Sequence, residues 1–231
     1  MASRLREYSV EMRTDRMLVR KGAEANLYLE KWHGLEVIEK KRLPKRYRVA
    51  KLDSKIRQFR TVREARLIHD AKSAGVPTPT IYSVDLGNAT IIMEHIRGAR
   101  VKEALDSLDH NARKALCYRI GRLIGRLHNA GIIHGDLTTS NIIVSNNRIV
   151  FLDFGLGEHS ENLEERGVDL LLMKRAFQSA HYKYSKECFD ALVKGYAKEV
   201  SSEASKEVVR RLRDVERRGR YVSRKVAPEG V

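Results

Sequence analysis

The sequence contains few of the residues that stabilise secreted and membrane proteins. Only two cysteines occur among its 231 residues, Cys117 and Cys188, and they stand far apart in the chain. This content argues against a small disulfide-stapled fold and favours buried thiols in a reducing compartment. No run approaches the roughly 18 apolar residues that a membrane helix needs, and the first residues show no apolar segment of the signal-peptide type. We therefore expect a cytoplasmic protein with no membrane partner.

Acidic residues are scarce in two stretches of a chain that is otherwise balanced in charge. The formal net charge is +15. Residues 40–60 contain ten Lys or Arg and one Asp, a net of +9, and residues 206–225 contain nine Lys or Arg and three acids, a net of +6. Such local basic stretches are typical of proteins that meet a polyanion, most often nucleic acid. A solvated surface tuned for solubility explains the charge equally well.

The first hundred residues have the patterns of strands with one helix. Apolar and aromatic runs on either side of His33 and Gly34 predict a β-hairpin. Residues 61–74 have a helical pattern, for which Thr61 is the expected N-terminal cap and Glu64 the residue that completes a capping box. The front of the chain is therefore expected to be a sheet with a single helix.

Helical patterns dominate the rest of the chain. In residues 109–131, apolar side chains recur at helical spacing on one face: Leu116, Ile120, Leu123, Ile124 and Leu127. Two short strand patterns follow, at 141–145 and from 148, and everything beyond about residue 163 appears helical. The rear of the chain is therefore expected to be helical with an embedded hairpin.

Polar residues gather at the ends of that hairpin. His134, Asp136 and Asn141 lie in the stretch HGDLTTSN just before the first strand, and Asp153 lies at the end of the second, in LDFGLG. A hairpin brings these ends together, so we expect Asp136, Asn141 and Asp153 to face one point. Two carboxylates and an amide oxygen suit magnesium held together with phosphate oxygens. Asp136 could then accept a proton from a hydroxyl nucleophile, which predicts phosphoryl transfer from a nucleotide.

These motifs resemble those of the eukaryotic-type protein kinase superfamily. HGDLTTSN resembles the catalytic loop H-R-D-L-x-x-x-N, and DFG at 153–155 is the kinase metal motif. The resemblance implies that ATP is bound, that Asp136 is catalytic, and that Asn141 and Asp153 hold magnesium or manganese. It also implies that Lys40, at the end of LEVIEKK, binds phosphate and forms an ion pair with Glu64.

Two further segments and one aspartate resemble parts of the nucleotide site of kinases. The stretch KGAEANLY stands where a glycine-rich loop is expected, so the resemblance implies phosphate binding by the loop residues Gly22, Ala23, Glu24 and Ala25. Met93–Ile96 resembles the hinge between kinase lobes, where the backbones of Glu94 and Ile96 would meet adenine. Asp169 resembles the buried aspartate that braces the catalytic loop.

The departures from the kinase pattern predict a reduced fold. Gly135 replaces the arginine that normally clamps a phosphorylated activation loop, and only thirteen residues separate Gly155 from Asp169, with no A-P-E element. We therefore expect an α+β, two-lobed protein-kinase-like fold in a minimal form that lacks the activation segment and peptide-substrate platform. The expected parts are an N-terminal lobe at 1–95, a helical lobe at 96–219 and a basic mobile tail at 220–231.

A smaller family matches in more detail. The stretches GAEA, K-x-R-x-P-K-x-Y-R from Lys40 to Arg48, EAR, HGDLTTSN and DFGLG resemble those of the atypical kinase of the KEOPS complex, the PRPK family, in its free-standing archaeal form. The resemblance implies an ATP-dependent serine/threonine kinase or ATPase that supports threonylcarbamoyladenosine (t(6)A) modification of tRNA. The implied partners are the KEOPS transferase subunit, the other KEOPS subunits and, through the complex, tRNA.

Two other functions stay open at this point. Aminoglycoside and choline kinases share H-G-D-L-x-x-x-N, so a small-molecule phosphotransferase is the alternative enzyme. A catalytically weak tRNA-binding subunit with a kinase fold is the alternative binding protein, although Lys40, Asp136, Asn141 and Asp153 are all present. The residues do not distinguish water from a protein serine or threonine as the phosphoryl acceptor.

Overall fold

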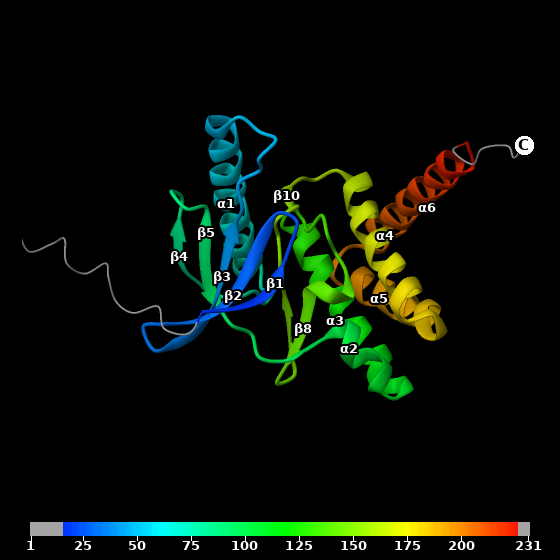
Figure 1. Ribbon diagram of the computed structural model, residues 1–231. Coiled ribbons are helices and arrows are strands. Elements are labelled where there is room, and N and C mark those ends of the chain that lie inside the picture. Colours follow the sequence, from blue (N-terminus) through cyan, green and yellow to red (C-terminus); the bar gives the residue numbers. More distant parts are fainter. Residues whose placement is uncertain (1–15, 226–231) are drawn as a thin grey trace, which may run out of the picture. The chain divides into compact units, whose positions relative to one another are not determined.

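The computed structural model describes residues 16–225, with the side chains of 219–225 excepted (Figure 1). The chain divides into two compact units. The first unit comprises the chain up to Ala65 together with Pro79–His95, and the second comprises Arg66–Thr78 and the chain from Ile96 onward. Residues 66–78 thus group with the second unit, although the expected N-terminal lobe extended continuously from residue 1 to 95. The two units are described separately below.

The first unit contains a five-stranded antiparallel sheet in the order β1-β2-β3-β5-β4. Its strands are β1 (Met17–Lys21), β2 (Ala25–Trp32), β3 (Leu35–Arg42), β4 (Ile81–Asp85) and β5 (Thr90–Glu94). The hairpin between β2 and β3 was predicted and is present. Its turn residues His33 and Gly34 have φ values of 49° and 80°, as expected for a tight turn that matches the twist of its strands.

Helix α1 (Ala50–Ser73) is longer than the sequence pattern indicated. Thr61 is buried in its interior, where its Oγ1 donates a hydrogen bond to the Arg57 carbonyl at 2.8 Å, so the prediction that Thr61 caps the helix is wrong. Residues 50–60 lack Gly and Pro, and Asp53 in the first turn accepts the Lys45 backbone N–H at 3.2 Å. This local sequence permits the helix to start before residue 61. The many Lys and Arg residues in this stretch obscure the apolar periodicity by which a helix is predicted.

The second unit is mainly helical. Its helices are α2 (Val101–Ala104), α3 (His110–Asn129), α4 (Leu163–Ala180), α5 (Ser185–Glu199) and α6 (Ser202–Lys225). Its strands are β6 (Ala99–Arg100), β7 (Ile132–Ile133), β8 (Ile142–Ser145), β9 (Arg148–Phe151) and β10 (Glu158–His159). They form the sheets β6-β8-β9 and β10-β7. The embedded hairpin is β8–β9, which turns at Asn146 and Asn147 with φ values of 45° and 63°.

The core of the second unit depends on close contact between α3 and α5. A Cβ on Gly121 of α3 would lie 1.9 Å from the Leu192 carbonyl oxygen, and a Cβ on Gly195 of α5 would lie 1.9 Å from the Tyr118 carbonyl oxygen. Both cysteines are fully buried, as the sequence indicated, and neither forms a disulfide. The predicted apolar face of α3 is buried apart from Leu123, which is partly exposed.

Two connections bear on the sequence predictions. Residues 156–162 link the DFG stretch to α4 and contain only the short strand β10, so the expected lack of an activation segment is confirmed. Helix α6 continues through Lys225, past the predicted start of the tail at residue 220. Residues 226–231 of the predicted tail lie outside the described part. Among residues 16–225, no helix is both long and apolar enough to cross a membrane.

Replacing Gly121 with alanine should destabilise the protein. The new methyl group would overlap the Leu192 backbone, and overpacking of this kind typically costs about 1–3 kcal/mol, more than the helix propensity gained. The free energy of unfolding, measured by chemical denaturation, should fall by that amount. Gly87→Ala is the control, because its Cβ would meet only the Asp85 side chain at 3.3 Å. Equal stability of Gly121→Ala and the parent would contradict the packing described.

Candidate active site

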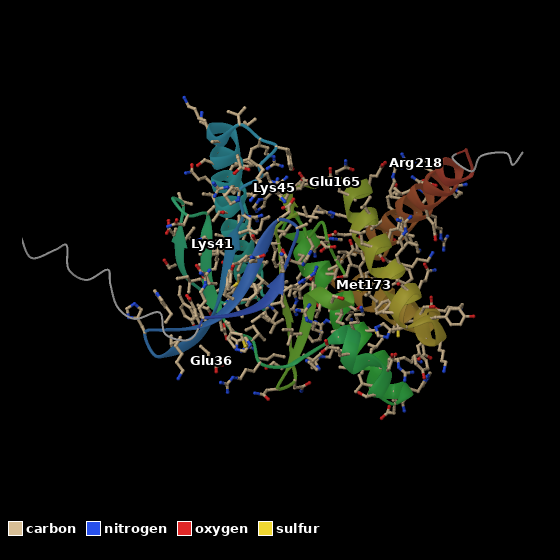
Figure 2. The ribbon with its side chains drawn as sticks, in the orientation of Figure 1. Glu36, Lys41, Lys45, Glu165, Met173 and Arg218 are labelled. Carbon is tan, nitrogen blue, oxygen red and sulfur yellow. The ribbon has the colours of Figure 1, made fainter. Side chains whose placement is uncertain are left out.

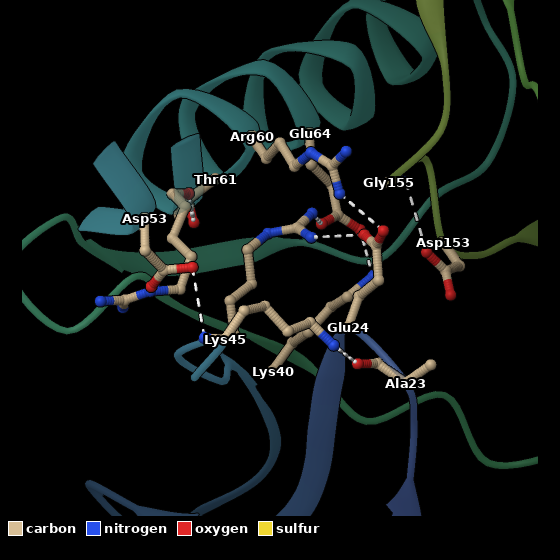
Figure 3. Close-up of polar contacts among 12 residues, drawn as sticks. Ala23, Glu24, Lys40, Lys45, Asp53, Arg60, Thr61, Glu64, Asp153 and Gly155 are labelled. Atoms are coloured by element: carbon tan, nitrogen blue, oxygen red, sulfur yellow. Dashed lines mark hydrogen bonds and ion pairs between the residues drawn. The ribbon is translucent and has the colours of Figure 1, made fainter. Parts of the chain in front are cut away.

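A buried ion pair lies between the sheet and the helix of the first unit. Lys40 Nζ on β3 lies 2.6 Å from Glu64 Oε1 on α1, and the exposed fractions of the two side chains are 8% and 1%. Figure 3 shows both residues among the polar contacts of this unit. The pair expected from the sequence is therefore present. Its burial holds the lysine ammonium at the end of one strand, in a fixed position.

Arg42 completes this ion pair and was not identified from the sequence. Its Nη2 lies 2.6 Å from Glu64 Oε2, and its side chain is 4% exposed, so the two oxygens of Glu64 are held by two different cations. The K-x-R spacing contained the signal for this contact. Residues two apart on a strand point to the same side, and Arg42 therefore follows Lys40 toward α1.

The loop that replaces the glycine-rich loop is held by its own acid. Glu24 accepts a hydrogen bond from Arg60 of α1 at 2.6 Å and a longer one from Arg42 at 3.5 Å. Partial burial alone would raise the pKa of Glu24, but the hydrogen bond and charge of Arg60, with the charges of Arg42 and Lys45, outweigh burial and lower it. The loop is thus fastened to α1 in the absence of a second and third glycine.

The other loop residues form a tight turn before β2. Gly22 N–H donates to the Ala25 carbonyl at 3.1 Å, and a Cβ on Gly22 would lie 2.5 Å from the same oxygen. The Lys45 ammonium donates to the Ala23 carbonyl (Figure 3). The one glycine that the loop retains is therefore required by close backbone contact.

These contacts change the interpretation of the basic stretch at residues 40–60. Lys40 and Arg42 are buried, and the buried Asp53 pairs with Arg57 at 2.7 Å and with Arg48 at 3.6 Å. Many of the cations in this stretch are thus paired with carboxylates inside the first unit. It is not one exposed patch of nine uncompensated charges.

The polar loop of the second unit is held by a buried carboxylate on α4. Asp169 Oδ2 accepts the His134 backbone N–H at 2.7 Å, and Asp169 Oδ1 accepts the Gly135 N–H at 2.9 Å. His134 then donates from Nε2 to the Leu152 carbonyl at 3.0 Å and accepts the Asp136 N–H at 3.3 Å. Asp169 therefore braces the loop as the resemblance implied, and His134 is bonded on both ring nitrogens.

Two further buried side chains, both missed from the sequence, support Asp169. His128 of α3 lies with Nε2 3.4 Å from Asp169 Oδ2 and with Nδ1 3.0 Å from the Tyr196 hydroxyl. Burial lowers the pKa of His128 in spite of the hydrogen bond to Asp169. A neutral imidazole can donate from Nε2 to the carboxylate and accept the tyrosine proton at Nδ1. The three side chains come from α3, α4 and α5, so only the folded helices bring them together.

The predicted catalytic and metal residues meet at the start of β8. Asn141 Nδ2 donates to Asp136 Oδ2 at 2.8 Å and to the Asp136 carbonyl at 2.9 Å. The Leu152 N–H donates to the Asn141 carbonyl at 2.8 Å, which places Asp153 next to Asn141. Asp153 has a left-handed φ of 60°, and its Oδ1 accepts the Gly155 N–H at 3.3 Å.

The donor set fits a hard divalent cation. Asn141 uses its amide nitrogen for Asp136, which leaves its amide oxygen, and Asp153 contributes a carboxylate. Among the described residues, no cluster of three or more His, Cys, Asp or Glu could hold a metal by itself. A cation held by Asn141 and Asp153 would complete its coordination with water and with oxygens of a ligand, which is how Mg²⁺ is commonly held with phosphates.

Gly135 stands where kinases usually have arginine, and its conformation explains the difference. It has φ 76°, and a Cβ at this position would lie 2.3 Å from the Leu156 carbonyl oxygen. Next to this contact, β7 and β10 pair through Ile133 and Glu158. The short chain after DFG thus packs on the polar loop, and no side chain fits between them.

The basic residues of α6 are partly neutralised. Glu207 pairs with Arg210 at 2.8 Å and with Arg211 at 3.0 Å. Arg218, which is labelled on α6 in Figure 2, lies 2.9 Å from Glu164 of α4. The buried residues Val208 and Leu212 pack α6 into the second unit. The helix therefore presents separate cations rather than a continuous basic surface.

The fold and the two polar centres define a kinase-like protein of the minimal, atypical class. Residues 8–196 match the model of the lipopolysaccharide kinase (Kdo/WaaP) family. The fold is similar to that of the Rio2 kinase of Chaetomium thermophilum, solved as an ADP/Mg²⁺-phosphoaspartate complex. The TM-score is 0.59 with 14% sequence identity, over 88% of this chain and 70% of that one. At this identity, the likeness shows the fold alone.

Relatives with higher sequence identity define the family more narrowly. The chain is 44% identical over 213 residues to the KEOPS complex subunit Bud32 of Pyrococcus abyssi, covering 90% of this chain and 97% of that protein. It is 45% identical over 215 residues to a probable bifunctional tRNA threonylcarbamoyladenosine biosynthesis protein of Methanothermobacter thermautotrophicus, of which it spans 38%. The chain therefore belongs to the kinase family that the matched model describes and to the family of the KEOPS complex subunit Bud32.

The contribution of Glu24 to stability should depend on pH. Because the folded state lowers the pKa of Glu24 below its ordinary 4.5, the stabilisation is present above the unfolded value and is lost as the pH falls through the folded one. The parent should exceed Glu24→Gln in free energy of unfolding by a constant amount above about pH 6, and the gap should close below pH 4.5. We expect under about 1 kcal/mol, since the side chain is 44% exposed.

Thermal unfolding followed across the pH range measures this difference. Glu161→Gln is the matched control, because Glu161 is exposed and has no ion pair among the described residues. A gap for Glu24→Gln that widens toward acid pH would contradict the assignment of Arg60 as its partner.

Proposed function

We propose that the chain is an ATP-dependent atypical kinase or ATPase and a subunit of a KEOPS complex. The observation that carries the proposal is the contact between Asn141 and Asp136, in which the amide nitrogen fixes the carboxylate at 2.8 Å. One side chain thereby orients Asp136 and keeps its own amide oxygen for a cation. The family relationship to Bud32 supports the same activity.

Each site residue then has a chemical role. Asp136 would orient a hydroxyl group and accept its proton. Asn141 and Asp153 would hold magnesium or manganese, which neutralises charge on the phosphates of ATP when bound. Lys40 would contact phosphate, with Glu64 holding the ammonium in place, and the turn from Gly22 to Ala25 would lie over the phosphates.

Adenine would be bound by the backbone at the end of β5. The Glu94 N–H already donates to the Thr80 carbonyl at 2.8 Å, so the groups proposed to meet the base are the Glu94 carbonyl and the Ile96 N–H. A carbonyl and an N–H on residues two apart match the donor and acceptor edge of adenine. The bound nucleotide is ATP in this proposal, because the Glu94 carbonyl needs an amino group as donor and adenine has one at that edge.

The acceptor is water or a serine or threonine hydroxyl. The connection of residues 156–162 contains no platform on which an extended peptide could lie, which supports hydrolysis over ordinary protein phosphorylation. A protein serine or threonine presented by a partner subunit would still reach Asp136 as a single hydroxyl. In this proposal the activity supports threonylcarbamoyladenosine modification of tRNA in the cytoplasm, and the tRNA is bound through the complex.

A small-molecule phosphotransferase is the second candidate. It is favoured by the match of residues 8–196 to a family named for a lipopolysaccharide kinase. The two candidates are separated by turnover of labelled ATP with the purified KEOPS transferase subunit and tRNA on one side, and with a panel of sugars and small alcohols on the other. Fast transfer to any small alcohol would favour the second candidate.

Replacing Asp153 with alanine should abolish metal-dependent ATP hydrolysis. The carboxylate is one of two protein groups proposed to hold the cation. Charge stabilisation by a bound metal typically lowers the reaction barrier by several kcal/mol, so its loss should slow turnover on the order of 100-fold or more. The measurements are turnover and ATP affinity across a magnesium titration, with circular dichroism as the check on folding. In this variant Gly155 loses its 3.3 Å hydrogen bond to the Asp153 side chain. Near-parental turnover would mean that the metal is held elsewhere.

Replacing Asp136 with asparagine should suppress turnover and preserve ATP binding. The amide is nearly the same size as the carboxylate but cannot accept a proton, and a general base contributes about 100- to 10,000-fold. Single-turnover rates and calorimetric ATP affinity separate the two effects. Asp106→Asn is the control, because Asp106 pairs with His181 in another part of the second unit. Loss of affinity in step with the rate would make Asp136 a binding group instead of a base.

A further inference from the structure

Asn141 is held through the two peptide groups that flank it. On its C-terminal side, its carbonyl accepts the Leu152 N–H at 2.8 Å, beside the pairing of β8 with β9. On its N-terminal side, the Asn141 N–H donates to the Thr138 carbonyl at 3.1 Å, within the single turn of 3₁₀ helix at 139–141. The other half of that second peptide group is the Ser140 carbonyl, and its partner comes from a different part of the second unit.

The partner of the Ser140 carbonyl is Arg100, at the end of β6. Nη1 of Arg100 donates to this carbonyl at 2.6 Å. A hydrogen bond from a guanidinium is charge-assisted and is stronger than one between neutral groups. The Arg100 side chain is half-buried, so the bond is partly shielded from water, in which it would be weaker.

The backbone of Arg100 is fixed by the strand that follows Asn141. Arg100 pairs with Ile143 of β8. Gly98 permits this close approach, because a Cβ on Gly98 would lie 2.3 Å from the Val144 carbonyl oxygen. The guanidinium and the turn that it contacts are therefore both carried by the small sheet β6-β8-β9.

The peptide group between Ser140 and Asn141 decides where the Asn141 side chain points. Its orientation defines the φ angle of Asn141, and φ and ψ are the only soft angles of the backbone. The Asn141 side chain donates to Asp136 Oδ2 at 2.8 Å, and its amide oxygen is the group proposed to bind a cation. Without a partner for the Ser140 carbonyl, the peptide group could rotate and carry the amide away from this position.

We propose that Arg100 is a positioning residue for phosphoryl transfer: by holding the Ser140 carbonyl, it sets the orientation in which Asn141 binds the divalent cation. The inference rests on the proposed function, since it assigns Arg100 to the cation site of that activity. Asp169 has the corresponding role at the start of the loop, where it accepts two backbone N–H groups. The loop is thus held by an anion at one end and by a cation at the other.

Replacing Arg100 with methionine tests this assignment, because the variant loses the donor and keeps a long side chain. Two measurements on the full chain report the metal requirement. The first is the Mg²⁺ concentration that gives half-maximal ATP hydrolysis, with the KEOPS transferase subunit and tRNA present. The second is Mn²⁺ binding in the presence of saturating ADP, followed by electron paramagnetic resonance. Both should need at least about tenfold more metal, the factor expected for a hydrogen bond to a charged group.

Two features distinguish positioning from a general loss of structure. At saturating metal, kcat of Arg100→Met should stay within about threefold of the parent, because Asp136 and Asp153 are unchanged and excess metal restores occupancy. Arg100→Lys, which keeps a charged donor, should recover part of the metal affinity. A fall in kcat with an unchanged metal requirement would overturn the proposal.

Arg119→Met is the matched control. The Arg119 guanidinium also donates to a backbone carbonyl, that of Asn147, but at the turn of the β8–β9 hairpin. Any loss of stability in this variant should leave the metal requirement at the parental value. An equal rise in both variants would show that the hairpin merely needs to be stable, and would overturn the specific role of Arg100.

Mn²⁺ binding also separates this inference from the proposed function. A parent that binds Mn²⁺ with ADP but hydrolyses no ATP would contradict the proposed function and leave the comparison of Arg100 variants valid. Unchanged Mn²⁺ affinity of Arg100→Met, beside a parent that does hydrolyse ATP, would overturn the inference alone. A parent that binds no Mn²⁺ would overturn both.

Discussion

Two backbone N–H groups of the polar loop, those of His134 and Gly135, point at the buried carboxylate of Asp169 at 2.7 and 2.9 Å. A buried carboxylate without such donors would be costly, and each donor would otherwise lose its hydrogen bond to water. The loop therefore has one position in which all three groups are satisfied. The orientation of Asp136, two residues on from His134, follows from that position.

The first unit uses the same device with side-chain cations. Glu64 is almost fully buried and is held by Lys40 on one oxygen and by Arg42 on the other, each at 2.6 Å. Removing one cation from such a group leaves uncompensated charge in a medium of low polarity, typically at a cost of several kcal/mol. The lysine proposed to meet phosphate is thus held by a network that continues to Glu24 in the loop proposed to cover it.

Close backbone contacts bring together the elements that carry the site. Gly135 packs against the Leu156 carbonyl, and Gly121 and Gly195 let α3 and α5 approach to backbone contact. Through the contact between α3 and α5, the Tyr196 hydroxyl reaches His128, and His128 in turn contacts the carboxylate of Asp169. Side chains at these glycines would separate the elements that carry the site. The short connections of this minimal fold therefore depend on glycine at the positions where two backbones meet.

Local patterns in the sequence were sufficient for the hairpins and for the order of the motifs. The turns at His33 and Gly34 and at Asn146 and Asn147 adopt the left-handed conformations that these residues tolerate. The D-x-x-x-x-N spacing and the hairpin predicted that Asp136, Asn141 and Asp153 would meet. The predicted start of α1 was wrong because Asp53, in the true first turn, accepts its hydrogen bond from Lys45, outside the helix. Thr61 is buried inside the helix, where its hydroxyl donates to the Arg57 carbonyl.

The sequence by itself determined which residues could perform phosphoryl transfer, because the chemistry requires their functional groups at short and regular spacings. Only the tertiary structure decided which charged side chains form ion pairs inside the protein. Arg42, Arg60, His128 and Tyr196 lie far in the chain from the carboxylates or imidazole that they contact. Their partners come from other strands and helices, and a pairing that depends on packing between distant elements has no local signature in the sequence.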